Sequence, residues 1–408
     1  MRNNQLDLFT NEEQRVEWYQ TVQRPTLPED VTSDTRPEDL DLNWRESDLP
    51  ERVRTKHVHR LHPYLGKFVP QLVEIFLRMY FKSGDTVYDP FCGSGTTLVE
   101  ANASDINAIG CDISSFNCLL SKVKTQRYDL HLARNEVLDI LQKTKATLQR
   151  DLFHESGYRV VGNTDNSYVL KWYAPQARQE LLTYNSLISD YSYQDLLKVI
   201  LSRSARSARL TTHFDLDFPK SPQTEPYQCY KHSRICAPTQ EALGFLQRYS
   251  LDTIKRLEEF AVVQTSASVI ILNGDSRYVQ LPNQLSGIIT SPPYVGLIDY
   301  HEQHRYAYEI LGLEDRRGLE IGAAKQGSSR KAQREYQESI AQVFRHACES
   351  MVSGGRMVVV AGDKYNLYDE IARLCEVEVE TVVHRHVNRR TGRRSGEFFE
   401  SIFIWRKP

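Results

Sequence analysis

The sequence predicts an α/β protein with a Rossmann-like, seven-stranded sheet and one large, mostly helical insert. Seven short apolar stretches have the length of β-strands, and amphipathic stretches with helical spacing separate most of them. A glycine-bearing loop also joins the first predicted strand directly to the next helix. This strand–loop–helix–strand order is typical of a parallel sheet with crossover helices.

The composition limits the class of protein. The chain has 408 residues, a formal net charge of −2, 40% hydrophobic and 25% charged residues, which are ordinary values for a globular enzyme. Collagen-like, low-complexity and wholly disordered chains are therefore excluded. No apolar run reaches the length of a membrane span, and the first residues lack the apolar core of a signal peptide. With seven scattered cysteines, we expect a reduced, cytoplasmic protein without a membrane partner.

Three regions follow from charge and periodicity. Residues 1–50 contain 12 acidic and 5 basic residues, four prolines and no sustained period, and we expect a flexible, acidic N-terminal arm. Residues 51–124 and 266–408 carry the sheet. Residues 125–265 between them are mostly helical, with amphipathic stretches at 130–148 and 243–260, and are a candidate region for recognising a large ligand.

The individual elements can be read in order along the sheet region. The predicted strands are 86–89, 107–112, 268–272, 287–290, 357–361, 378–384 and 401–405. The predicted helices are 71–80, 96–102, 331–350 and 368–375.

The loop DPFCGSGTT (89–97) follows the first strand and opens a helix. Its two glycines let the backbone approach a ligand closely, and the helix N-terminus offers free N–H groups. It lacks the third glycine of the dinucleotide motif and the GK[ST] of a P-loop. Asp112 ends the next strand, where an acidic side chain can accept the hydroxyls of a ribose. An adenosine-containing ligand therefore fits, although a simple tight turn would also explain the glycines.

A second motif, TSPPY, ends the strand at 287–290. Two consecutive prolines fix the backbone at the carboxyl end of this strand, where parallel sheets bind ligands. The Ser291 hydroxyl and the Pro292 carbonyl can accept hydrogen bonds from the exocyclic amine of a nucleobase. Tyr294 can stack on a base that is flipped out of a duplex. The alternative is a Pro-Pro strand terminator without a chemical role.

Together these motifs resemble those of S-adenosylmethionine-dependent DNA amino-methyltransferases, which modify N4 of cytosine or N6 of adenine. DPFCGSGTT resembles the cofactor loop of that family, and Ser291, Pro292, Pro293 and Tyr294 resemble its catalytic motif. The resemblance covers about 60–120 and 268–408. It implies a methyltransferase sheet that binds S-adenosylmethionine.

The resemblance also implies which residues contact the methyl donor. The segment HPYLGKFVPQLVE (62–74) resembles the one that closes over the methionine end, and NGDSR (273–277) resembles the motif beside the adenine. The expected cofactor residues are Lys67, Phe68, Pro70, Asp89, Phe91, Gly93, Gly95, Thr96, Asp112, Ile113 and Asp275.

Serine before PPY favours cytosine N4 within this family, with adenine N6 as the alternative. Cytosine C5 is disfavoured because the chain has no Pro-Cys dipeptide to supply a nucleophile. Modification of RNA or of a protein amide, and a DNA-binding or clamp-docked subunit that has lost transfer, are further alternatives. Two features depart from the family pattern: the glycine loop precedes SPPY, and the insert falls between the second and third strands. From its position, the insert at 125–265 is a candidate DNA target-recognition region.

Two basic stretches suggest contact with double-stranded DNA. Arg203, Arg206 and Arg209 recur every third residue within the insert, and Arg389, Arg390, Arg393 and Arg394 lie between the last two strands. Arginine can contact phosphates or guanine edges. An ordinary exposed face is the alternative for both stretches.

Other side chains are less informative. Asp299, Tyr300, His301, His304 and Arg305 follow SPPY and either hold the flipped base or pack. Cys229, His232 and Cys236 lie close together in the sequence, but Cys-x6-Cys is unlike common zinc motifs and a fourth ligand is missing. No metal site is therefore predicted.

Two protein partners are considered. QLDLF (Gln5 to Phe9) resembles the short peptide that docks on the replication sliding clamp, with Leu and Phe filling an apolar groove. A separately encoded restriction endonuclease is the other, because the chain has no apparent nuclease motif.

Overall fold

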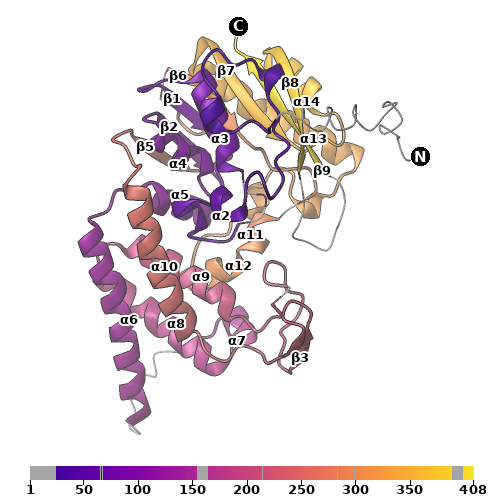
Figure 1. The fold of residues 1–408 in the computed structure, drawn as a ribbon. Helices are drawn as coiled ribbons and strands as arrows, with labels where there is room; N and C mark the ends of the chain where they lie inside the picture. Colours follow the sequence, from indigo (N-terminus) through magenta and orange to yellow (C-terminus); the bar gives the residue numbers. More distant parts are fainter. Residues whose placement is uncertain are drawn as a thin grey trace, which may run out of the picture.

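The computed structural model describes residues 24–64, 66, 68–153, 164–213, 215–282, 284–297, 299–387 and 398–408. A sheet with helices on both faces forms one part, and a helical insert forms the other (Figure 1). None of the helices among these residues is long and apolar enough to cross a membrane.

The central sheet contains all seven predicted strands in the order β5-β2-β1-β6-β7-β9-β8. The first five in this order run parallel, while β9 is antiparallel to both β7 and β8. The bounds are β1 (Thr86–Asp89), β2 (Asn107–Asp112), β5 (Val269–Asn273), β6 (Leu285–Thr290), β7 (Met351–Ala361), β8 (Glu378–Val387) and β9 (Phe398–Arg406). The architecture is the Rossmann-like, seven-stranded α/β sheet that the sequence predicts.

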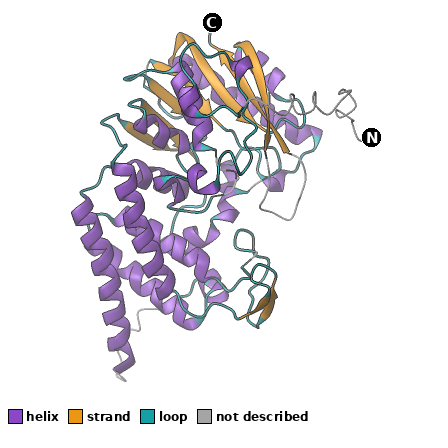
Figure 2. Cartoon of the chain, viewed as in Figure 1, coloured by secondary structure: helices purple, strands orange, loops and turns teal. Residues whose placement is uncertain are grey.

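Helices cover both faces of the sheet (Figure 2). Alternation along the central strands places side chains in two cores, one on each face. Val87 and Ile289 pack on one face with α3 (Pro70–Tyr80) and α4 (Thr96–Ala103). Tyr88 and Ile288 pack on the other face with α13 (Arg330–Ser350) and α14 (Tyr368–Cys375). Because both faces are covered, apolar residues occupy successive positions in these strands, which explains why the strands could be recognised in the sequence.

The N-terminal region differs from the flexible arm that we expected. Val31, Leu42, Trp44 and Leu49 are buried in the same core as α3. The Trp44 Nε1 donates a hydrogen bond to the carbonyl oxygen of Thr26 at 2.8 Å. Residues 24–50 are therefore docked on the sheet domain. Their apolar side chains follow no helical or strand period, so only the acidic residues between them were conspicuous in the sequence.

The remaining elements before the insert are short. They are η2 (Pro28–Asp30), η3 (Pro37–Asp39), α2 (Glu51–Arg54) and η4 (His57–Arg60), followed by α5 (Ser115–Thr125) after β2.

The insert is a helical bundle whose core continues into η4 and α5 of the sheet domain. It comprises α6 (Leu130–Phe153), α7 (Ser167–Trp172), α8 (Pro175–Leu187), η5 (Ile188–Asp190), α9 (Gln194–Ala208) and α10 (Leu243–Ala261), with a small hairpin of β3 (Tyr227–Cys229) and β4 (Arg234–Cys236). After β6 come α11 (Tyr300–Gln303), α12 (Arg305–Leu311), η6 (Arg317–Leu319) and η7 (Ala324–Gln326). Tyr306 and Ala307 of α12 belong to the insert core, so the chain that follows SPPY connects the sheet to the insert.

Candidate active site

The two sequence motifs meet at the carboxyl ends of neighbouring strands. β1 and β6 pair in parallel, with Val87 opposite Gly287 and Tyr88 opposite Ile288. The glycine loop leaves β1, and SPPY leaves β6. From β1 the sheet continues through β2 and β5 on one side, and through β6 and β7 on the other. Such a reversal of strand order opens a crevice in which α/β sheets bind ligands.

A pocket with about 930 Å³ of empty space occupies this position. Its walls come from the segment before α3, the glycine loop, the ends of β2 and β5, SPPY and the chain near η6. It is lined by Tyr64, Gly66, Phe68, Asp89, Pro90, Phe91, Cys92, Gly93, Ser94, Thr96, Asp112, Ile113, Ser114, Asn117, Gly274, Asp275, Ser276, Ser291, Pro293, Tyr300, Leu319, Glu320 and Ile321.

The glycine loop requires its two glycines. Gly93 and Gly95 have φ of +49° and +79°, which side chains of L-residues rarely adopt. A Cβ on Gly95 would also lie 2.7 Å from the Ser121 Oγ, and one on Gly93 would lie 3.0 Å from the Tyr64 hydroxyl. The loop is fixed from behind by α5, because Ser121 donates to the Gly93 carbonyl and Lys124 to the Ser94 carbonyl.

Asp112 is held at the end of β2 by three N–H donors. Its Oδ2 accepts from the Gly93 backbone at 2.9 Å, and its Oδ1 accepts from the Ser114 backbone at 2.8 Å and from the Asn117 Nδ2 at 3.1 Å. Burial raises the pKa of Asp112 to about 6, and the three hydrogen bonds oppose that rise. At neutral pH the pocket therefore presents a fixed carboxylate next to the glycine loop.

Asp89 connects the two motifs. Its carboxylate, 2% exposed, accepts a hydrogen bond from the Thr290 hydroxyl at 2.6 Å and another from the Phe91 backbone at 3.1 Å. Thr290 directly precedes Ser291, so a single side chain fixes both the glycine loop and the start of SPPY. Burial raises the pKa of Asp89 to about 6.

The SPPY turn is supported from two sides. Ser291 and Pro293 line the pocket, whereas Pro292 is buried. The Tyr336 hydroxyl of α13 donates to the Pro293 carbonyl at 2.9 Å. The Tyr294 hydroxyl donates to the Glu400 Oε1 at 2.9 Å, and Arg385 pairs with the other oxygen of Glu400 at 2.6 Å. Burial, with the neighbouring Glu400, raises the pKa of Tyr294 well above its usual value.

Most of the expected cofactor residues line this one pocket: Phe68, Asp89, Phe91, Gly93, Thr96, Asp112, Ile113 and Asp275. Gly95 and Pro70 are at the N-termini of α4 and α3 and do not line it. Lys67 lies outside the described residues. Arg277 pairs with the Asp275 carboxylate at 2.6 Å, and this arginine holds the pKa of Asp275 below its usual range despite partial burial.

Several residues that the sequence interpretation missed also line the pocket. Tyr64 stacks on Tyr300, with ring centroids 5.8 Å apart. Asn117 contributes an Oδ1 that is buried without a hydrogen-bond partner among the described residues. Asn117 lines the pocket, and its Nδ2 donates to the Asp112 carboxylate. Tyr64 belongs to a segment already singled out, but no signal in the sequence pointed to Asn117.

The histidines after SPPY have different surroundings. His301 and His304 are buried, and His301 Nδ1 contacts the Glu320 carboxylate that lines the pocket. Burial lowers the pKa of His304 to about 3, so its imidazole is neutral at physiological pH. Packing therefore accounts for His304, while Tyr300 lines the pocket itself.

The three insert arginines correct an expectation. Arg203 pairs with Asp252 at 2.6 Å, and Arg206 pairs with Asp217 at 2.5 Å. Arg209, 2% exposed, packs over the Tyr306 ring and donates to the Tyr168 hydroxyl. These side chains hold the insert together instead of forming the exposed, DNA-contacting face that their spacing suggested. Arg203 and Arg206 lie about one turn apart on α9, and Arg209 is the C-cap residue of that helix.

The second basic stretch and the proposed clamp peptide both lie outside the described residues. They are Arg389, Arg390, Arg393 and Arg394, and Gln5 to Phe9.

The expectation that Cys229, His232 and Cys236 lack a fourth metal ligand is wrong, because His213 lies beside them. The cluster is far from SPPY in the sequence and does not line the pocket.

Comparison with known proteins gives consistent relatives. Residues 4–123 match the family model for N6/N4 DNA methylases. The chain is 39% identical to the Type II methyltransferase M.MjaII of Methanocaldococcus jannaschii, over 87% of this chain and 81% of that protein. It is 24% identical to M.MvaI of Kocuria varians, over 58% of this chain and 53% of that one. It is also 24% identical to M.BsoBI of Geobacillus stearothermophilus, over 75% and 64% respectively.

Proposed function

This chain belongs to the S-adenosylmethionine-dependent DNA amino-methyltransferases, and we propose that it methylates the exocyclic N4 of cytosine in duplex DNA after flipping the base. The observation that carries the proposal is that Gly93 of the glycine loop, Asp112 at the end of β2 and Ser291 of SPPY line one pocket. A donor site and an acceptor site are thereby joined at the crevice between β1 and β6.

The pocket fits the methyl donor. Asp112 offers a fixed carboxylate for two ribose hydroxyls, and Asn117, which donates to that carboxylate, lines the pocket beside it. A side chain on Gly93 would meet Tyr64, which lines the same pocket. When bound, S-adenosylmethionine supplies an electrophilic methyl group on a sulfonium. The protein then has to hold the acceptor amine in line with that methyl and keep water away.

The SPPY turn supplies the acceptor side. An exocyclic amine is a poor nucleophile because its lone pair is delocalised into the ring. The Ser291 hydroxyl and the Pro292 carbonyl each accept a hydrogen bond from one N–H of this amine, which draws the lone pair back toward nitrogen. Asp89 and Tyr336 hold this turn in place through Thr290 and the Pro293 carbonyl. The transferred group needs no covalent attachment to the protein.

Tyr294 is the proposed stacking partner of the flipped base. Its hydroxyl is anchored to Glu400, and Glu400 is in turn anchored to Arg385. An anchored ring has little freedom to lose when a base stacks on it. Serine as the first residue of SPPY favours cytosine over adenine, and adenine N6 is the alternative acceptor.

We propose the segment between β8 and β9 as a DNA contact. Ser401 of β9 pairs with Ala361, the last residue of the parallel strand β7, so β9 begins near the carboxyl edge of the sheet. The segment that precedes β9 in the sequence carries Arg389, Arg390, Arg393 and Arg394. Arginines suit contacts to the phosphates of duplex DNA. Their replacement by glutamine is expected to weaken duplex binding and to reduce its salt dependence.

The test uses the full-length protein and a donor with an isotope-labelled methyl group. Duplex DNA of mixed sequence, RNA of the same length and a protein extract are offered separately, and labelled duplex is digested to nucleosides. We expect label in duplex DNA, on N4-methylcytosine. Label on N6-methyladenine would refute the base, label only on RNA or protein would refute the substrate, and no label with donor bound would favour a silent subunit.

Two partners extend the proposal. Gln5 to Phe9 is proposed to dock on a sliding clamp, and a titration of this peptide against a clamp that shows no binding at high micromolar concentration would remove it. A cognate endonuclease with the same recognition sequence is the second proposed partner. Its test is whether DNA methylated by this protein resists cleavage by that nuclease.

A further inference from the structure

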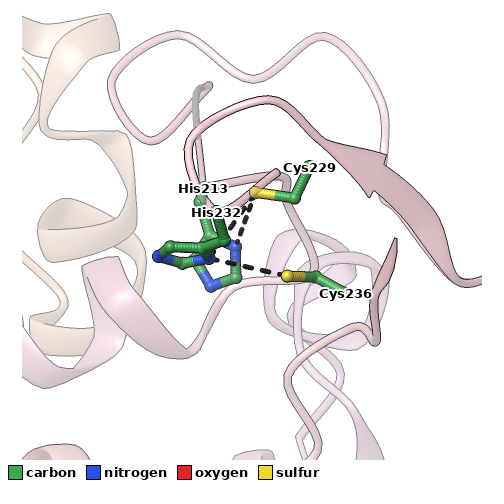
Figure 3. A group of neighbouring side chains, drawn as sticks. All are labelled: His213, Cys229, His232 and Cys236. Carbon is green, nitrogen blue, oxygen red and sulfur yellow. Dashed lines mark hydrogen bonds between the residues drawn. The ribbon is translucent and has the colours of Figure 1, made fainter. Parts of the chain in front are cut away.

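A second cluster of side chains lies in the insert, apart from the methyl-transfer pocket. We propose that His213, Cys229, His232 and Cys236 form a structural zinc site. Figure 3 shows the two imidazole rings and the two sulfur atoms directed toward a common point. One ligand atom from each residue lies within 4.8 Å of all the others.

The distances match the edges of a zinc tetrahedron. The Cys229 Sγ lies 3.6 Å from the Nδ1 of both His213 and His232, and the Cys236 Sγ lies 3.5 Å from the His232 Nδ1. Zn–S bonds of about 2.3 Å and Zn–N bonds of about 2.0–2.1 Å, at the tetrahedral angle, place sulfur and nitrogen about 3.6 Å apart. A zinc ion therefore fits with little movement of these ligands.

The surrounding segment needs a stabilising element. Between residues 211 and 241, the only buried apolar side chains in the described part are those of Cys229, Cys236 and Pro238. By contrast, Tyr230 is 86% and Ile235 is 71% exposed. β3 and β4 have three residues each, and so short a hairpin is marginal in water without further support. A segment without an apolar core is commonly held by a metal.

The hairpin arranges the ligands in the required way. Cys229 ends β3 and Cys236 ends β4, with the strands antiparallel and Cys229 opposite Arg234. His232 lies in the turn between them, next to Ser233, which has a φ of +51°. His213 reaches the cluster from the chain after α9. The ion would thus tie the hairpin to the helical bundle, which is the role of a closed, four-ligand site.

The chemistry of the donor set favours zinc. Two thiolates and two neutral imidazoles form a tetrahedral S₂N₂ set, and two thiolates balance the charge of a divalent ion. The Tyr227 hydroxyl contacts the His213 Nδ1 at 2.8 Å and also accepts from the His213 backbone at 3.1 Å. With zinc bound, Tyr227 would keep only the backbone contact.

The other candidate cluster, His57, His59 and Glu100, lacks these properties. The Lys56 ammonium already lies 2.8 Å from the Glu100 carboxylate, where it takes the place that a cation would need. No thiol belongs to it. The first cluster therefore has the two thiols that favour a metal, whereas the second cluster contains an internal ion pair in place of a metal.

The first test is the metal content of the full-length protein, purified without a chelator and without nickel resin. We expect about one zinc per chain by mass spectrometry, and X-ray absorption at the zinc edge with two sulfur and two nitrogen neighbours. Less than about 0.1 zinc per chain, with no uptake after dialysis against an equimolar zinc salt, would overturn the site. Oxygen neighbours only would overturn it as well.

Variants distinguish zinc bound at this site from metal that is bound adventitiously elsewhere. The double variant Cys229→Ser, Cys236→Ser is expected to lose the zinc, and the control Cys348→Ser, at a partly buried cysteine outside the cluster, is expected to keep it. Retention of zinc by the double variant would refute the ligand assignment. If that variant does not fold, cobalt substitution of the wild-type protein still decides, because tetrahedral thiolate coordination gives an intense visible spectrum that an all-oxygen site lacks.

Discussion

Asp112→Asn tests the donor side of the pocket most sharply. The carboxylate of Asp112 accepts three N–H bonds at 2.8–3.1 Å, and we propose that it also accepts the ribose hydroxyls. Asparagine preserves the size but replaces one acceptor oxygen by an amide donor. A hydrogen bond to a charged group contributes about 1.5–3 kcal/mol, so donor affinity should fall roughly 10- to 150-fold.

Isothermal titration of the full-length protein with S-adenosylmethionine measures this change. Asp105→Asn is the matched control, because Asp105 is exposed, lies outside the pocket and has a φ of +58° that asparagine also adopts. The control should bind the donor like the wild type. An affinity of Asp112→Asn within twofold of the wild type, with thermal stability retained, would refute the ribose assignment.

The remaining predictions concern turnover, pH and stability. Ser291→Ala should lower turnover by roughly 100-fold or more in a labelled-methyl assay, with donor affinity nearly unchanged; equal losses of both would contradict its role at the acceptor. Because the pKa values of Asp112 and Asp89, which both line the pocket, are raised to about 6, donor affinity should fall as the pH drops through that value, and Asp112→Asn should show a weaker dependence in the same titration. Glu400→Gln removes the charge that anchors Tyr294 and should reduce turnover at least about tenfold without weakening donor binding; unchanged single-turnover rates would show that the anchor has no role in transfer. Trp44→Ala should lower the free energy of unfolding in urea by about 3 kcal/mol, since this side chain is buried in the sheet core, and a loss below about 0.5 kcal/mol would argue against docking of the acidic segment.

The sheet was predictable because its strands have a simple environment. Strands such as β6 and β7 are buried on both faces, so their apolar runs stand out from any local background. The glycine loop and SPPY were visible because backbone constraints leave glycine and proline few substitutes. Their meeting in one pocket then follows from the topology of parallel strands, whose carboxyl ends share one edge.

The other features depend on contacts between distant residues. Arg209 resembles an exposed cation in the sequence, and only the fold brings the Tyr306 ring and the Leu216 carbonyl around it. The apolar residues around Trp44 follow no helical or strand period in the sequence, yet the Trp44 side chain is buried against the sheet. His213 lies 16 positions from Cys229, too far for a recognisable ligand spacing, and the hairpin closes that distance. In each case tertiary packing overrides a local pattern.

The most direct test of the central proposal uses a whole genome as the substrate, since it contains every short recognition sequence. The full-length protein and its Ser291→Ala variant are expressed in a bacterial host without DNA methylation of its own, and host DNA is hydrolysed for nucleoside mass spectrometry. We predict N4-methylcytosine in the wild-type sample and none with the variant. N6-methyladenine without N4-methylcytosine, or equal N4-methylcytosine from the variant, would contradict the proposed reaction.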